Sequence, residues 1–182
     1  MTGRWFFCFI LILSTAARAE NLNTEWSARS WQSDEGLPDN AVVEVAQGGD
    51  GFLWVATRSG LARFDGIRFR EFSAVTTAGD QTAVLYALCL DRNNRLWVAK
   101  DRGVLVSVAD GRTTALTPEN GLPVLPVRMM VGDREGALWI SYLEGGVVVR
   151  LSGGKVQKFS AADGLPGGTT CQIGRASCRE RV

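Results

Sequence analysis

The sequence predicts an all-β protein built from repeated units of four antiparallel strands, and three observations lead to this prediction. Tryptophans at positions 54, 97 and 139 are separated by 43 and 42 residues, and each lies in a short apolar run. These runs alternate with turns rich in Gly, Asp and Asn. The 21 glycines argue against helical repeats of similar length, which contain few turn glycines. A period of about 43 residues with four strands is typical of a β-propeller blade.

The first unit can be followed strand by strand. We expect strands at 41–47, 52–57, 61–64 and 67–72. A Gly-Asp-Gly turn at 49–51 connects the first pair, because glycine permits a positive φ. Asp65-Gly66 predicts a two-residue hairpin before the last strand. Both faces of the second strand are apolar, so both must be buried, as they would be between two neighbouring blades.

Other landmarks keep the same period. Gly36-Leu37-Pro38 recurs at positions 121 and 164. We therefore predict a partial propeller over residues 20–172, about 3.5 blades of an incomplete ring, with blades at 38–80, 81–122 and 123–165 and the start of a fourth. We interpret the repeated tryptophans as packing between blades and the glycines that follow them as turn residues; stacking of each indole on a sugar is the alternative. These structural repeat residues are Trp54, Trp97, Trp139, Gly60, Gly103 and Gly146.

Residues 1–19 have the features of a signal peptide. Arg4 precedes the nine apolar residues of 5–13, and Ala17-Arg18-Ala19 is a cleavage pattern of small residues. An uncleaved membrane anchor is the alternative, but nine apolar residues are too few to cross a bilayer. We therefore expect the chain to be exported to the periplasm.

Three segments of the first unit carry a resemblance to a known family. Residues 31–42 (WQSDEGLPDNAV), 50–57 (DGFLWVAT) and 60–66 (GLARFDG) resemble the two-component regulator propeller repeat. The resemblance implies the periplasmic sensor part of a signalling protein that is anchored in the inner membrane and takes part in a phosphorelay. Its output would be a histidine kinase, a diguanylate cyclase or a DNA-binding regulator. The implied partners are the remaining blades and the cytoplasmic output domain of the same protein, and a second copy in a homodimer.

The length of the chain predicts a fragment of a longer protein. A ring usually needs 4 to 8 blades, and an open arc would expose apolar blade faces and strand edges to water. Residues 173–182 (IGRASCRERV) show no strand-like alternation and carry three arginines. We interpret them as a translated sequencing adaptor; a genuine basic terminus is the alternative.

Composition excludes several kinds of chemistry. The chain has no histidine, so a Ser-His-Asp triad and imidazole metal ligands are absent from it. The formal net charge is +1, but the basic excess lies at the two ends, which argues against nucleic acid as a partner. The acidic residues fall mainly at turns, where local hydrogen bonds account for them. We predict no catalytic residue, no metal and no cofactor in this segment; the alternative is an exported propeller enzyme or binding scaffold that acts on polysaccharide.

The candidate ligand site lies in the loops between the second and third strands of each blade. These loops share one rim of a propeller with the connections between blades, and they vary most between the repeats. Loops held by a rigid scaffold commonly carry recognition. We predict that they bind an unknown small molecule, anionic or polar, such as a saccharide; a merely solvated face is the alternative. The predicted residues are Arg58, Ser59, Lys100, Asp101, Arg102, Tyr142 and Glu144.

Overall fold

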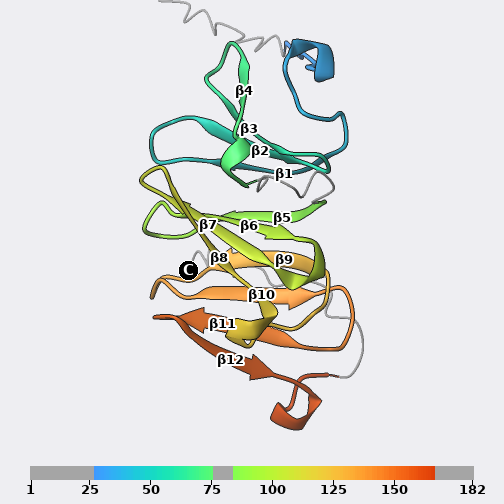
Figure 1. Ribbon diagram of the computed structural model, residues 1–182, viewed down its shortest axis with the longest axis vertical. Coiled ribbons are helices and arrows are strands. Elements are labelled where there is room, and N and C mark those ends of the chain that lie inside the picture. Colours follow the sequence, from blue (N-terminus) through green and yellow to red (C-terminus); the bar gives the residue numbers. More distant parts are fainter. Residues whose placement is uncertain (1–26, 76–83, 167–182) are drawn as a thin grey trace, which may run out of the picture. The chain divides into compact units, whose positions relative to one another are not determined.

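The computed structural model describes residues 27–75 and 84–166, and their strands form three four-stranded antiparallel sheets (Figure 1). Contacts divide the chain into Met1–Ser30 and Trp31–Val182, and all three sheets lie in the second unit. The first sheet contains β1 (Val42–Gln47), β2 (Leu53–Thr57), β3 (Leu61–Phe64) and β4 (Phe69–Glu71). The second contains β5 (Leu85–Leu90), β6 (Leu96–Lys100), β7 (Leu105–Ala109) and β8 (Arg112–Leu116). The third contains β9 (Val127–Gly132), β10 (Leu138–Tyr142), β11 (Val148–Ser152) and β12 (Lys155–Phe159).

Each sheet is a simple meander in which the strands pair in chain order. The first strands of neighbouring sheets lie against one another, β1 beside β5 and β5 beside β9. The first strand is therefore the innermost strand of its sheet, and the fourth is the outermost. This is the radial arrangement of a β-propeller, and it confirms the predicted fold class.

The hydrophobic core lies in the seams between sheets. One cluster joins the first and second sheets and includes Ala56, Leu85 and Val98, and another joins the second and third and includes Leu105 and Ile140. All five residues of β6 are buried, because this strand belongs to the sheet that has a neighbour on each side. Burial of both faces, which the sequence predicts, is thus observed in the second sheet.

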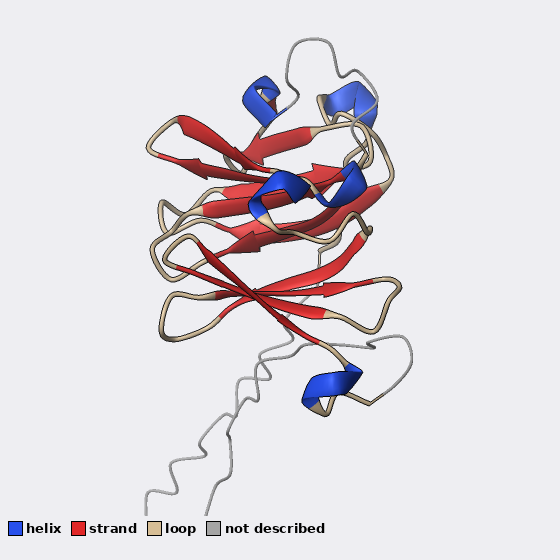
Figure 2. Cartoon of the chain, turned by 60° about the horizontal axis from the view of Figure 1, so that its bottom comes forward, coloured by secondary structure: helices blue, strands red, loops and turns tan. Residues whose placement is uncertain are grey.

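The Gly-Leu-Pro motifs follow short 3-10 turns of one kind: η1 (Ser33–Glu35), η4 (Pro118–Asn120) and η5 (Ala161–Asp163) (Figure 2). At each, a side chain at the third position accepts a hydrogen bond from the backbone N–H of the residue before the turn; the Asn120 Oδ1 to Thr117 N distance is 2.8 Å. The following glycine has a φ of 90° to 97°, which suits a residue without a Cβ. Two further 3-10 turns are η2 (Ser73–Val75) and η3 (Asp101–Gly103).

The last hairpin of the first sheet differs from the prediction. Phe64 pairs with Phe69, so the loop has four residues instead of two, and β4 begins at Phe69 instead of residue 67. Asp65 is the cause, because its Oδ1 accepts hydrogen bonds from the backbone N–H groups of Ile67 and Arg68, both at 2.9 Å. The Asp110-Gly111 turn of the second sheet does have two residues, since Ala109 pairs with Arg112.

The glycines that follow the tryptophans differ among themselves. Gly103 and Gly146 have φ values of 74° and 54°. Gly60 has no positive φ, and a side chain there would instead approach the Cβ of Pro38 to 3.2 Å. A turn conformation thus accounts for two of these glycines, and a close approach accounts for the third.

Two predicted segments, the signal peptide at 1–19 and the tail at 173–182, lie outside the described residues. The predicted domain boundaries stay predictions. Among the residues that the structure describes, no helix has the length and apolar character needed to cross a membrane.

Candidate functional site

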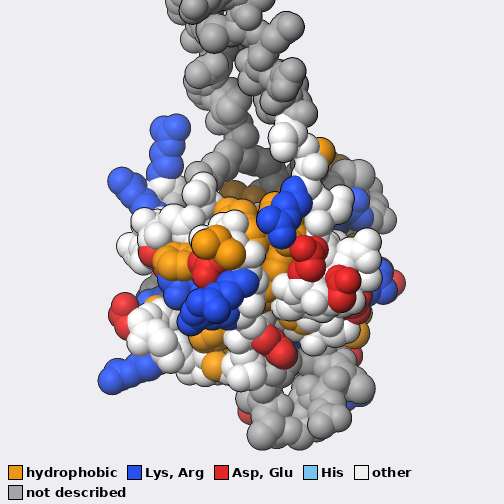
Figure 3. Space-filling view, turned by 90° about the horizontal axis from the view of Figure 1, so that it is seen from above, with side chains coloured by type: hydrophobic (Ala, Val, Ile, Leu, Met, Phe, Trp, Pro, Cys, Tyr) orange, Lys and Arg blue, Asp and Glu red, His pale blue; other side chains and the backbone are white. Residues whose placement is uncertain are grey.

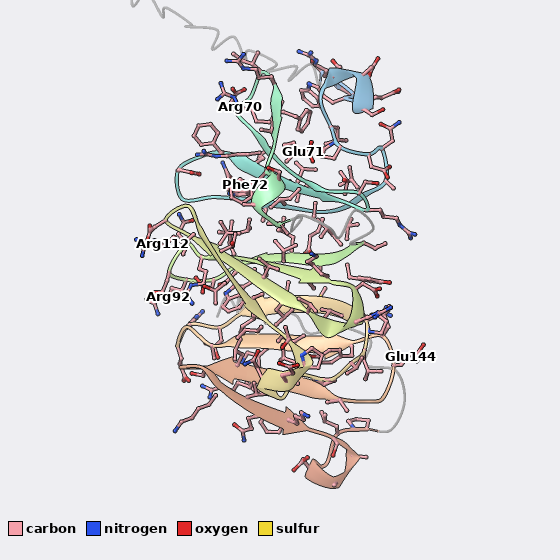
Figure 4. All side chains as sticks on the ribbon, in the orientation of Figure 1. Arg70, Glu71, Phe72, Arg92, Arg112 and Glu144 are labelled. Atoms are coloured by element: carbon pink, nitrogen blue, oxygen red, sulfur yellow. The ribbon has the colours of Figure 1, made fainter. Side chains whose placement is uncertain are left out.

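The loops predicted to bind a ligand lie at one end of the sheets. They connect β2 with β3, β6 with β7 and β10 with β11. Figure 4 labels Glu144 at this end, and Arg92 and Arg112 at the opposite end. If the four strands of each sheet are lettered A to D in chain order, these loops connect strands B and C. We therefore call the end that carries the β2–β3, β6–β7 and β10–β11 loops the B–C rim. Five of the seven predicted residues are exposed there: Arg58, Ser59, Asp101, Arg102 and Glu144.

Lys100 and Tyr142 are buried below this rim. The Lys100 side chain belongs to a residue that is 5% exposed, and its Nζ donates a hydrogen bond to the carbonyl oxygen of Val75 at 3.2 Å. Tyr142 is fully buried, and burial raises the pKa of its hydroxyl. Both are the last residues of their strands. The corresponding residue of the first sheet, Thr57, is buried too, and its hydroxyl donates a hydrogen bond to the carbonyl oxygen of Gly60. Strand-end side chains on this face enter the core, so the exposed part of the rim begins one residue later.

Of the predicted cations, Arg58 and Arg102 are therefore the exposed ones. Arg102 has a φ of 55°, and its side chain is 85% exposed. The Asp101 carboxylate accepts a hydrogen bond from the Arg102 backbone N–H at 2.8 Å and holds the loop in this conformation. Next to Arg58, the Ser59 hydroxyl donates to Asp39 at 2.7 Å. The pKa of Asp39 is lowered by the Ala41 backbone N–H first, and then by the Ser59 hydroxyl.

At the opposite end, two aspartates organise the turns between the first and second strands. Asp133 accepts hydrogen bonds from the backbone N–H groups of Glu135 and Ala137 and from Nε1 of Trp139 at 2.9 Å. Burial would raise the pKa of Asp133, but these three donors outweigh it and the pKa is lowered. Asp91 binds the Trp97 indole and its own turn in the same way. Both aspartates stand six residues before a repeated tryptophan, a spacing that could have identified them in the sequence.

A second arrangement at this end was not predicted. In the first sheet Arg63 pairs with Asp50 at 2.6 Å, and its guanidinium carbon lies 5.7 Å from the Trp54 ring centroid. In the third sheet Arg150 pairs with Glu135 at 3.2 Å, and its guanidinium carbon lies 5.9 Å from the Trp139 ring. Each arginine sits opposite the tryptophan in strand register. Alignment of the repeats on tryptophan brings together the acidic members, four residues before it, but not the arginines, which follow it by 9 and 11 residues.

The described ranges offer no cluster of His, Cys, Asp or Glu side chains that could hold a metal ion. The carboxylates just described are engaged by backbone N–H groups, indoles and arginines.

The fold and these turns define a β-propeller domain. Residues 36–59 match the sequence model of the two component regulator propeller family, so the resemblance stated from the sequence is confirmed for the first repeat. No curated protein sequence matches the chain.

Solved structures of similar fold include extracellular domains of bacterial signalling proteins. One belongs to a hybrid two component system of B. thetaiotaomicron, with a TM-score of 0.64 and 18% identity over 78% of this chain and 20% of that chain. Another, from the same organism, belongs to a one component system, with a TM-score of 0.58 and 18% identity over 72% of this chain and 20% of that chain.

An enzyme has a similar fold as well. Virginiamycin B lyase from Staphylococcus aureus has a TM-score of 0.56 and 17% identity over 68% of this chain and 43% of that chain. The chain therefore spans less than half the length of these structures. At such identities the likeness concerns the propeller fold alone.

Proposed function

We propose that this propeller is a ligand-sensing domain of a membrane-bound signalling protein of the two-component type. The observation that carries the proposal is the match of residues 36–59 to the two component regulator propeller family. The fold that the chain shares with extracellular domains of bacterial signalling proteins supports it. Under this proposal the domain is exported to the periplasm, and the whole protein is anchored in the inner membrane and has a kinase or cyclase output.

The B–C rim is the proposed recognition surface. Its loops project from strands that are fixed by the seams between sheets, so their positions are held by the core. Arg58 and Arg102 are exposed there, with Arg102 Nε 4.0 Å from the Asp101 carboxylate, and their guanidinium groups can donate hydrogen bonds to an anionic or polar small molecule. Binding would favour one of two states of the receptor by a difference in affinity and so change its output.

A binding experiment tests this proposal. The purified protein is titrated with glucose 6-phosphate and with glucose, and the thermal midpoint is recorded. We expect the phosphorylated sugar to raise the midpoint, and the double variant Arg58→Ala/Arg102→Ala to lose the shift. Lys158→Ala, on the outermost strand β12, serves as the control for general loss of positive charge. A shift that persists in the double variant would argue against recognition at the B–C rim.

An exported enzyme or scaffold that acts on polysaccharide is the second candidate; the lyase of similar fold supports only that a propeller can carry an enzymatic activity. Incubation of the protein with a polysaccharide distinguishes the two: a sensor leaves the polymer length unchanged, whereas an enzyme shortens it. Shortening that requires the purified protein would replace the sensing proposal with the enzymatic one.

A further inference from the structure

The second sheet lacks both members of the ion pair that the other two sheets place over their tryptophan. At the position of Arg63 and Arg150, opposite Trp97 in strand register, stands Ser107. At the position of Asp50 and Glu135, four residues before the tryptophan, stands Asn93. The cation and the anion are thus both replaced by small neutral side chains in the same blade.

A larger cavity accompanies this replacement. Between the second and third sheets, Trp97, Ser107, Asn93 and Thr114 line a cavity of about 910 Å³. The corresponding cavity between the first and second sheets, which the Arg63 and Asp50 side chains line, measures about 560 Å³. The difference has the direction expected if an arginine and a carboxylate fill the smaller one and are absent from the larger.

Two guanidinium groups line the larger cavity. Arg95 lies with its guanidinium carbon 5.7 Å from the Trp97 ring centroid, and Arg112 lines the same cavity. Within the described part of the chain, neither arginine has a carboxylate within ion-pair distance. In the first and third sheets the arginine over the indole does have one. Among the described residues, the second sheet therefore provides the cations and the aromatic ring of this arrangement but places no carboxylate within ion-pair distance of these cations.

Two carboxylates line the cavity, and they differ in availability. Asp91 already accepts hydrogen bonds from Asn93 N, Arg95 N and Trp97 Nε1. Asp110 stands exposed at the turn between β7 and β8. Nearby, Arg92 donates a hydrogen bond to the carbonyl oxygen of Arg134, which adds positive charge to this end of the seam. The lining thus holds two arginines and two aspartates, and Arg92 beside it gives this end of the seam one further positive charge.

We propose that the cavity between the second and third sheets is a binding site for a small polyol that carries a carboxylate, such as a sugar acid. The ligand carboxylate takes the place of the missing Asp50 or Glu135 counterpart and pairs with Arg95 and Arg112. The hydroxyls of Ser107 and Thr114 and the amide of Asn93 supply hydrogen bonds to the polyol. This site lies at the end of the sheets opposite the B–C rim and does not depend on the function proposed for that rim.

Titration calorimetry with galacturonate and galactose tests the proposal, because the two sugars differ in the carboxylate. The unmodified protein is expected to bind galacturonate at least about tenfold more tightly than galactose, and Arg95→Gln to weaken galacturonate binding by about tenfold. Asp110→Asn is expected to strengthen it, since it removes a repelling charge. Arg70→Ala, on β4 and outside the cavity, is the matched control for loss of an arginine.

The decisive variant restores the arrangement of the other two sheets. Asn93→Glu/Ser107→Arg supplies an internal ion pair over Trp97 and is expected to abolish galacturonate binding while the thermal midpoint is kept or raised. Galacturonate binding that survives in this variant would place the ligand elsewhere. Equal affinity for the two sugars, or no heat from galacturonate up to about 10 mM, would overturn the proposal itself.

Discussion

At the level of single residues, Glu44 connects the innermost strands of two sheets. It lies on β1, half-buried, and its Oε2 accepts a hydrogen bond from the backbone N–H of Leu88 on β5 at 2.8 Å. Burial raises the pKa of Glu44, and the Leu88 N–H offsets this only in part. The charged form is therefore less favourable in the folded chain than in the unfolded one.

This raised pKa makes the stability of the chain depend on pH. The folded state binds the Glu44 proton more tightly than the unfolded state, so the contribution of Glu44 is greatest below its unfolded pKa and falls as pH rises through the folded pKa. Glu44→Gln retains an oxygen for the Leu88 N–H but cannot ionise. We expect this variant to exceed the unmodified protein in unfolding free energy at pH 7 and to match it at pH 3.5. Urea unfolding at both pH values measures the difference.

Glu44→Ala provides the comparison for the hydrogen bond itself. It leaves the buried Leu88 N–H without this acceptor, which costs about 1 kcal/mol or more relative to Glu44→Gln at either pH. An unfolding free energy of Glu44→Gln that lies below that of the unmodified protein at pH 7 would contradict the assignment.

At the level of elements, the turn η3 depends on the positive φ of Gly103 and on its lack of a Cβ. Its φ is 74°, and a Cβ at this position would overlap the carbonyl oxygen of Pro123 in the connection that leads to the third sheet. In Gly103→Ala, the alanine must therefore adopt the left-handed conformation, and its Cβ must also push the Pro123 backbone away. We expect a loss of unfolding free energy clearly above the roughly 1–2 kcal/mol of the conformation alone, measured by urea unfolding.

Gly111 is a matched control, because its φ is 72° and a Cβ there would have no neighbour within 4 Å. Gly111→Ala is expected to lose only about 1–2 kcal/mol. Similar losses for the two variants would show that the contact with Pro123 carries no cost.

The elements were more predictable than the site. The tryptophan period and the alternation of apolar residues predicted sheets and blades, because packing between blades imposes them on every repeat. The predicted length of the loop between β3 and β4 was wrong, because the Asp65 carboxylate accepts hydrogen bonds from two backbone N–H groups. A prediction from the Asp-Gly pair alone does not include these bonds. Burial of Lys100 was missed because it depends on which face of a strand end meets the neighbouring sheet. The replacement at Asn93 is visible in the sequence at a constant distance from the tryptophan, but the replacement at Ser107 needed the strand register and the ion pairs of the other sheets.

At the level of the whole molecule, residues outside a sheet cover its faces. The end of the structure that carries the first sheet shows hydrophobic side chains among basic and acidic ones (Figure 3). Trp31 precedes η1 and packs on the aromatic rings of Phe64 and Phe69, with centroid distances of 5.1 and 6.4 Å. It stands at the repeat position of Leu116, the last residue of β8, which packs against the cluster between the second and third sheets. Trp31 thus packs on the first sheet in the way that Leu116, at the end of the outermost strand of the second sheet, packs against the third.

This relation predicts that Trp31 contributes to stability although it belongs to no sheet. Trp31→Ala removes a half-buried indole from two aromatic contacts, and we expect a loss of about 2 kcal/mol in unfolding free energy. Trp31→Phe should retain most of it, since a ring still reaches Phe64. Urea unfolding followed by far-UV circular dichroism measures the effect on the sheets without relying on the fluorescence of the indole being removed. An unchanged urea midpoint in Trp31→Ala would mean that packing on this face contributes nothing to the stability of the first sheet. The other two sheets, by contrast, gain their core from the packing of one blade on the next.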